Sequence, residues 1–198
     1  VQPLCKALDD SYDGVRYAAG QTLGLLRSTD AVPALTKCLE DKNMDMRIIA
    51  VRALGEIGEK SVVKNLTPFL KDENVRLRSE TVFALGKIGD PKAIEALIPL
   101  LKDTDKRVRL NTAQALGKLG NKEGYNVAVE LLKDQDPMFR AQAADALGDI
   151  NEKKAIPELE KIREDTDPYV RNAVEISLMR LGWRLRPPTP VTPLKEKK

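Results

Sequence analysis

The chain has 198 residues, a length that fits one or two ordinary domains or one elongated array. Its 33 Lys and Arg residues and 30 Asp and Glu residues give a net charge of +3. Because the sequence contains no histidine, it excludes His-based catalysis and metal sites that need His ligands. Residues 184–198 hold five basic side chains and one acidic one, a net +4 that leaves −1 on the rest of the chain. Because the rest of the chain has no excess positive charge, nucleic acid is not expected as a partner.

Two cysteines, Cys5 and Cys38, are too few for a disulfide framework or a zinc site, and they indicate a reducing compartment. No apolar run approaches the roughly 20 residues that a membrane span needs. We therefore expect a cytoplasmic protein with no membrane partner. We find no catalytic constellation, and we expect neither a metal nor a cofactor.

Three residue types recur at a constant interval of 31 residues, which is the signature of a repeat architecture. The arginines are Arg16, Arg47, Arg78, Arg109, Arg140 and Arg171. The aspartates are Asp10, Asp41, Asp72, Asp103, Asp134 and Asp165. A Leu-Gly pair keeps the same interval five times, from Leu23-Gly24 to Leu147-Gly148, and Met179 stands where the sixth glycine would be.

Each repeat predicts two helices and no strand. In the fourth repeat, Asp90-Pro91 starts a first helix, residues 103–106 break it, and a second amphipathic helix ends at Gly120. The prolines Pro68 and Pro99, late in the first helix, predict kinks. The closing Leu-Gly-x-Ile/Leu-Gly segments are interpreted as helix C-caps.

One helical hairpin cannot bury its apolar faces alone, so neighbouring repeats must stack. We predict an all-α, right-handed α-solenoid of six repeats with the second helices on the concave side. Its expected repeats are residues 1–27, 28–58, 59–89, 90–120, 121–151 and 152–182. After them, Trp183 is expected to cap the last repeat. The Pro-rich basic segment that follows is interpreted as a flexible linker, with a polyproline ligand or a remnant of the expression vector as alternatives.

The second-helix segments 46–58 (MRIIAVRALGEIG) and 108–120 (VRLNTAQALGKLG) resemble the HEAT-like repeat of the phycobilin-lyase type. The resemblance covers residues 1 to about 182 and implies the HEAT-like fold. Proteins of this type include bilin-attachment and bilin-release factors, scaffolding adaptors and consensus binders. They also include an iron-dependent hydroxylase whose metal is held by His-Glu pairs, and the absence of histidine excludes that activity here.

The Asp and Arg series have a structural interpretation that we prefer to a phosphate-binding stripe. Each Asp would lie at the turn between the two helices and cap the second one. Each Arg, six residues later, would pair with a carboxylate of a neighbouring repeat. Exposed pairs of this kind contribute only about 0–1 kcal/mol each.

Helical geometry directs four positions of each second helix away from the core, namely those one, two, five and nine residues after the recurring Arg. Apolar side chains at such positions indicate an interaction surface. The predicted binding residues are Tyr17, Ile48, Ile49, Arg52, Phe83, Lys87, Leu110, Gln114 and Lys118. Ile48 and Leu110 share one position, so packing between repeats is an alternative explanation for both.

The sequence thus predicts a non-enzymatic scaffold or adaptor that binds a protein or peptide on its concave face. The alternative rests on the resemblance alone: a bilin lyase-like factor that attaches a chromophore to phycobiliproteins or releases it from them.

Overall fold

The computed structural model describes residues 1–183, which fold into helices with no strand among them. The Pro-rich basic tail of the sequence lies outside the described residues. The first helices of the six repeats are α1 (Gln2–Ala7), α3 (Val32–Lys37), α5 (Val63–Leu66), α7 (Ile94–Leu97), α9 (Tyr125–Leu131) and α11 (Ile156–Glu160). The second helices are α2 (Asp13–Leu26), α4 (Met44–Ile57), α6 (Val75–Ile88), α8 (Lys106–Lys118), α10 (Pro137–Ile150) and α12 (Pro168–Arg180).

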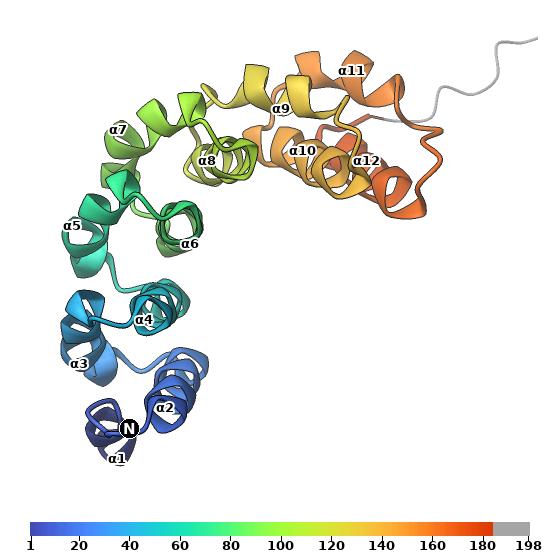
Figure 1. Ribbon diagram of the computed structural model, residues 1–198. Helices are drawn as coiled ribbons and strands as arrows, with labels where there is room; N and C mark the ends of the chain where they lie inside the picture. The colour runs from blue at the N-terminus through green and yellow to red at the C-terminus, as the bar shows by residue number, and fades with distance from the viewer. Residues whose placement is uncertain (184–198) are drawn as a thin grey trace, which may run out of the picture.

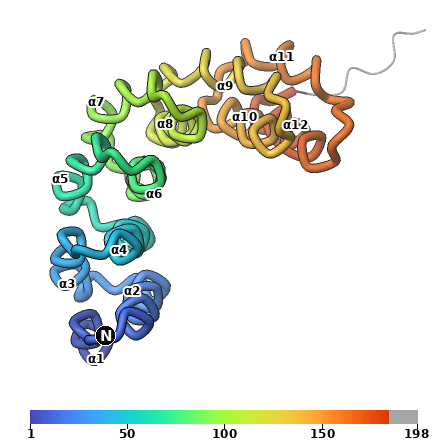
Figure 2. The backbone as a smooth tube through the Cα atoms, viewed as in Figure 1, coloured from blue at the N-terminus to red at the C-terminus, as the bar shows by residue number. Residues whose placement is uncertain are grey.

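The repeats form an arch of two layers (Figures 1 and 2). The odd-numbered helices make the outer, convex layer, and the even-numbered helices make the inner, concave one. Each inner helix packs against the inner helices before and after it, from α2 to α12. The predicted all-α solenoid is therefore confirmed. Within residues 1–183, no helix is both long enough and apolar enough to cross a membrane.

The core runs between the two layers as two adjoining clusters of buried side chains. One extends from Leu8 to Leu116, and the other from Leu110 to Leu181. Trp183 packs against the second cluster, where its indole N–H donates to Glu160 Oε1 at 2.9 Å and its ring lies 4.6 Å from the Arg163 guanidinium carbon. These contacts attach the chain after α12 to the outer layer of the last repeat.

The outer helices are short, and 3₁₀ turns extend several of them. The 3₁₀ segments are Thr29–Ala31, Cys38–Glu40, Lys60–Val62, Thr67–Lys71, Pro91–Ala93, Ile98–Lys102 and Lys153–Ala155. Pro68 and Pro99 each fall second in such a segment. Their missing N–H donors coincide with a change from α to 3₁₀ winding, where the sequence predicts a kink.

The two glycines of each Leu-Gly-x-Ile/Leu-Gly segment have different roles, so the interpretation of the whole segment as a C-cap is only half right. The second glycine ends the inner helix in the left-handed region, as Gly58 does at φ 76°. Arg27 and Asn151 occupy that conformation in the first and fifth repeats. The first glycine instead lies inside the helix, against the inner helix of the next repeat.

Gly55 illustrates this close approach. A Cβ atom added there would lie 2.8 Å from the Ala84 Cβ and 2.9 Å from the Ala84 Cα, which is too close for two carbon atoms. Gly24 faces Ala53 and Gly86 faces Ala115 in the same way. The recurring glycine is thus a packing requirement between consecutive inner helices. Met179, which takes the sixth place in this series, is 64% exposed.

The recurring Asp does not cap the inner helix, contrary to the prediction. Its carboxylate accepts the backbone N–H of the residue two positions later, as Asp72 does from Asn74 at 2.8 Å. That later residue is the N-cap: Asn74 accepts from the Leu77 N–H at 3.1 Å. The same turn recurs in all six repeats, except that Tyr12 stands at the N-cap position of α2 and makes no side-chain cap.

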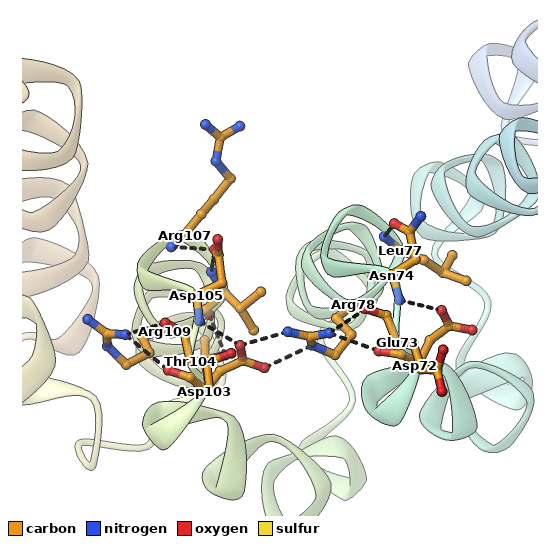
Figure 3. A network of polar contacts seen from close by, with 12 residues as sticks. Asp72, Glu73, Asn74, Leu77, Arg78, Asp103, Thr104, Asp105, Arg107 and Arg109 are labelled. Atoms are coloured by element: carbon orange, nitrogen blue, oxygen red, sulfur yellow. Dashed lines mark hydrogen bonds and ion pairs between the residues drawn. The ribbon is translucent and has the colours of Figure 1, made fainter.

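The recurring Arg joins this turn to the neighbouring repeat (Figure 3). Arg78 donates to the backbone carbonyl of Asp72 in its own repeat at 2.9 Å. Its Nε and Nη2 donate to the two carboxylate oxygens of Asp103 in the next repeat at 2.9 and 2.8 Å. Arg140 holds Asp165 in the same bidentate way, and Arg16 contacts Asp41 at 2.7 Å.

The predicted pairing with a carboxylate of the neighbouring repeat therefore holds for four of the arginines, since Arg109 contacts Glu130 of the next repeat at 3.9 Å. Arg47 and Arg109 bond their own turns, through the carbonyls of Asp41 and Asp103, but make no ion pair with the next recurring Asp. Lys106 replaces Arg109 as the partner of Asp134, with both distances at 2.9 Å. These contacts support the structural interpretation of the two series.

Replacing Gly55 by Val is expected to lower the free energy of unfolding. Valine is the better helix former by a few tenths of a kcal/mol, yet overpacking against Ala84 costs about 1–3 kcal/mol. Urea titration followed by circular dichroism measures the difference. Ala18→Val, at an exposed position of α2, is the control and should change stability by less than about 1 kcal/mol. A Gly55→Val protein as stable as wild type would contradict the packing role.

The Arg140–Asp165 pair predicts an acid-sensitive contribution to stability. Hydrogen bonds from Arg140 hold the pKa of Asp165 below its ordinary value, against the opposing effect of burial. Because the folded pKa is depressed, the pair stabilises the fold above the unfolded pKa of about 4, and this contribution is lost as the pH falls through the folded pKa.

Arg140→Met should weaken this dependence. We expect the loss of unfolding free energy between pH 6 and pH 3 to be smaller than in wild type. Arg47→Met is the matched control, because Arg47 hydrogen-bonds no carboxylate within residues 1–183, and it should keep the wild-type pH dependence. An equally steep dependence in Arg140→Met would show that the pair does not act in this way.

Candidate functional site: the concave groove

A groove with a volume of about 580 Å³ crosses the middle of the concave face. Four consecutive inner helices supply its walls. The polar and large apolar lining residues are Arg52 and Glu56 from α4, Glu80, Phe83 and Lys87 from α6, Arg107, Asn111 and Gln114 from α8, and Met138, Phe139 and Gln142 from α10. Its size falls within the range of small-ligand pockets, and its open shape would also admit a peptide.

Phe83 is the large aromatic side chain exposed in this groove, with 46% of its surface accessible. It lies in the middle of α6, between two lysines. The Lys87 Nζ is 6.0 Å and the Lys118 Nζ 5.9 Å from the centroid of its ring. The sequence-predicted residues Arg52, Phe83, Lys87, Gln114 and Lys118 thus lie in or beside one groove.

Three predicted anchors are not exposed, and the expectation for them is wrong. Ile48 and Leu110 are each 1% exposed, and Ile49 is 9% exposed. The position directly after the recurring Arg points between adjacent inner helices, so packing between repeats, the alternative explanation, accounts for Ile48 and Leu110. Ile49 covers Gly20 of the preceding inner helix, where an added Cβ would lie 2.6 Å from the Ile49 Cγ2.

The position of Ile48 and Leu110 is filled by a polar residue in the third repeat. Ser79 is 6% exposed, and its hydroxyl oxygen accepts a hydrogen bond from the Asn111 side-chain amide at 2.9 Å. The predicted anchor Tyr17 is half-buried against the N-terminal part of the core and does not line the groove. Of the five apolar anchors predicted, Phe83 alone lies exposed in the groove.

Ion pairs between repeats occupy the acidic side chains of the groove. Arg52 forms a two-point contact with Glu80, and Lys87 pairs with Glu56, which also accepts from Arg27 at 3.4 Å. The hydrogen bond from Lys87 holds the pKa of Glu56 below its ordinary value. Both carboxylates are therefore already engaged by cations of neighbouring repeats.

A second polar set lies beyond the groove, on α10. Asp149 accepts from Arg180 at 3.1 Å and from the Gln114 amide at 3.4 Å. Asp145 is half-buried and forms no ion pair among the described residues, and burial raises its pKa above the ordinary value. Gln114 and Asp149 thus continue the chain of lateral contacts between inner helices.

Three lining residues, Arg107, Met138 and Phe139, lie in the first turn of an inner helix and were missed by the sequence reasoning. Arg107 and Met138 stand two residues before the recurring Arg, and Met138 is 49% exposed, whereas Phe139 is buried. The four positions chosen from helical geometry excluded that turn. An apolar Met directly after a helix-starting Asp-Pro is the signal that could have identified it.

The family model for HEAT repeats matches residues 1–77, 39–112, 63–127 and 94–179. No curated protein matches the chain.

Several solved structures share the fold. An engineered protein aligns with a TM-score of 0.60 at 22% identity, covering 92% of this chain and 97% of that one. The complex of CpcE and CpcF, a phycocyanin lyase from Nostoc sp. PCC7120, gives 0.59 at 21% identity, with 91% and 94% covered. A designed armadillo repeat protein in complex with the peptide (KR)4 gives 0.60 at 18%, with 90% and 98% covered.

At these sequence identities the likeness shows a shared fold and indicates neither a function nor a partner. The overlapping matches to the family model cover nearly all of the described residues. The chain therefore belongs to the family of HEAT repeat proteins.

Proposed function

We propose that this protein is a non-enzymatic scaffold or adaptor that binds a protein segment or peptide in its concave groove. Repeat solenoids of this kind present an extended concave surface, and that surface is what they use in binding. Residues of α4, α6, α8 and α10 would line the bound segment. Arg52, Gln114 and Met138 would border it, and Phe83 would be its central apolar contact.

The exposure of Phe83 is the observation that carries this proposal. An aromatic side chain is costly to leave in water, and aromatic residues are enriched at protein interfaces. Phe83 lies in a concavity that Met138 and Lys87 also line, and the Lys118 Nζ lies 5.9 Å from the centroid of its ring. A partner side chain placed there would bury apolar surface on several sides.

The kind of partner is also supported by a structural neighbour. A designed armadillo repeat protein of the same overall fold is in complex with the peptide (KR)4. This supports a peptide as the occupant and does not specify its sequence.

A second candidate function is the handling of a bilin chromophore, which the fold likeness to the CpcE–CpcF phycocyanin lyase supports. It is tested by mixing the purified protein with a free bilin and a phycobiliprotein acceptor. A visible absorption band that co-elutes with the protein, or transfer to the acceptor, would favour this candidate. Its absence would leave peptide binding as the better proposal.

The test of peptide binding begins with selection from a random peptide library displayed on phage. Selected peptides are then measured by fluorescence anisotropy against wild type and Phe83→Ala. We expect about a tenfold or greater loss of affinity in the variant, because aromatic anchors at the centre of an interface contribute 1 kcal/mol or more. Since Phe83 is half-exposed, the variant should remain folded.

Tyr12→Ala is the matched control, because Tyr12 is 72% exposed and does not line the groove. Ile49→Glu is unsuitable as a binding probe, since it would place a charge in the packed contact with Gly20 and unfold the repeat. Peptides that bind Phe83→Ala and wild type equally would contradict binding in this groove.

A further inference from the structure

We propose that the groove selects an acidic segment: two carboxylate side chains that flank an apolar one, with the apolar side chain on Phe83 and the carboxylates at Arg107 and Lys118. This inference rests on the proposed function, because it specifies the chemistry of the partner that the same groove would bind. The inference follows from a difference among the charged side chains of the groove: some already form ion pairs between repeats, and others do not.

The charges left without an ion pair around Phe83 are positive. Arg107 and Lys118 are both exposed, and within residues 1–183 neither has a carboxylate within ion-pair distance. In Figure 3 the Arg107 guanidinium extends away from Asp105 and from the Arg–Asp network. A partner carboxylate would therefore meet a cation that it need not first detach from another anion.

The carboxylates lining the groove are, by contrast, already engaged. Glu80 accepts from two atoms of Arg52, and Glu56 accepts from Lys87 and Arg27. A basic segment would have to compete with these bonds. Asp145, which has no ion pair among the described residues, is half-buried on α10 and does not line the groove, although its charge interacts at longer range with Arg180 and Lys118. The balance of available charge thus favours an acidic partner.

The distance between the two cations also determines how far apart the two carboxylates of the bound segment would be. Arg107 and Lys118 lie at the two ends of α8, 11 residues apart, which corresponds to about 16 Å along the helix axis. An extended chain covers that distance in roughly five residues. Phe83 lies on the neighbouring helix at the register of Gln114, between the two cations. Carboxylates four to six residues apart with an apolar residue between them fit this arrangement.

The experiment uses synthetic peptides of equal length. In the first peptide, two Glu residues stand about five residues apart with a Leu between them. The second peptide has Lys in place of both Glu residues. The third keeps both Glu residues and has Ser in place of the Leu. Fluorescence anisotropy at 50 and 150 mM salt measures their affinities. We expect the acidic peptide to bind at least about tenfold more tightly than the other two, and more weakly at the higher salt.

Charge reversal identifies the contacts. Lys118→Glu and Arg107→Glu should each weaken the acidic peptide by about tenfold and improve the Lys peptide. Lys64→Glu is the matched control: Lys64 is exposed on the outer helix α5, has no ion pair among the described residues, and reverses the same charge outside the groove. Equal weakening by Lys64→Glu would show a general effect of net charge and would overturn the assignment.

A single-stranded oligonucleotide with the same number of charges tests the other class of polyanion. Affinity for it equal to that for the acidic peptide would overturn the proposal, because phosphates would then satisfy the two cations without an apolar contact. The proposal would also be overturned if the Ser-substituted peptide bound as tightly as the acidic peptide with the central Leu.

Failure of this inference is distinguishable from failure of the proposed function. If library selection yields neutral or basic peptides whose binding depends on Phe83 but not on Lys118, the groove binds peptides and the acidic preference is wrong. If no peptide shows dependence on Phe83, the proposed function itself is wrong.

Discussion

The close approach of consecutive inner helices is the constraint on which the rest of this structure depends. At Gly55 the two backbones come so near that a single added carbon would lie 2.8 Å from Ala84. A glycine on one helix meets Ala or Ser on the next at four such contacts, and the backbone and side chain of Ile150 at Gly117. The approach fixes where each inner helix lies relative to its neighbour, and so determines which side chains face the core, the adjoining repeat or the concave surface.

The ion pairs and turns follow from that stacking. With the repeats in place, Arg78 reaches both the carbonyl of its own turn and the carboxylate of Asp103 in the next repeat. Each such Arg therefore connects a turn to the neighbouring turn on the edge of the arch. The same lateral proximity brings Arg52 to Glu80 and Lys87 to Glu56 on the concave face. Contacts that stabilise the stack thus also decide which groove charges remain available.

The 31-residue period was sufficient to predict the helices, their pairing and the solenoid, because only a repeated packing unit requires such regularity. The burial of Ile48 and Leu110 depends on how closely neighbouring inner helices approach, and a helical wheel of one helix contains no information about the next. The sequence also predicted the wrong N-cap residue, since the cap is the residue two positions after the recurring Asp. The conformation of the turn determines which backbone N–H each carboxylate accepts, and the sequence does not show that conformation. Phe83, Lys87 and Lys118, predicted from the sequence to be exposed, are exposed in or beside the groove, whereas the place of Arg107 and Met138 in its lining depends on how the helices assemble.

Binding specificity in such an array must come from the positions that break the repeat. The recurring Arg, Asp and Gly are used in turns, in ion pairs and in helix contacts, so they cannot distinguish one partner from another. At the register of Phe83, by contrast, the other five repeats carry Gln21, Arg52, Gln114, Asp145 and Ile176. Stacking places no common demand on this register, and each repeat is free to present a different side chain to a bound segment. A segment bound in the groove would meet the different side chains that α4, α6 and α8 present at this register, which is how a regular scaffold comes to recognise an irregular sequence.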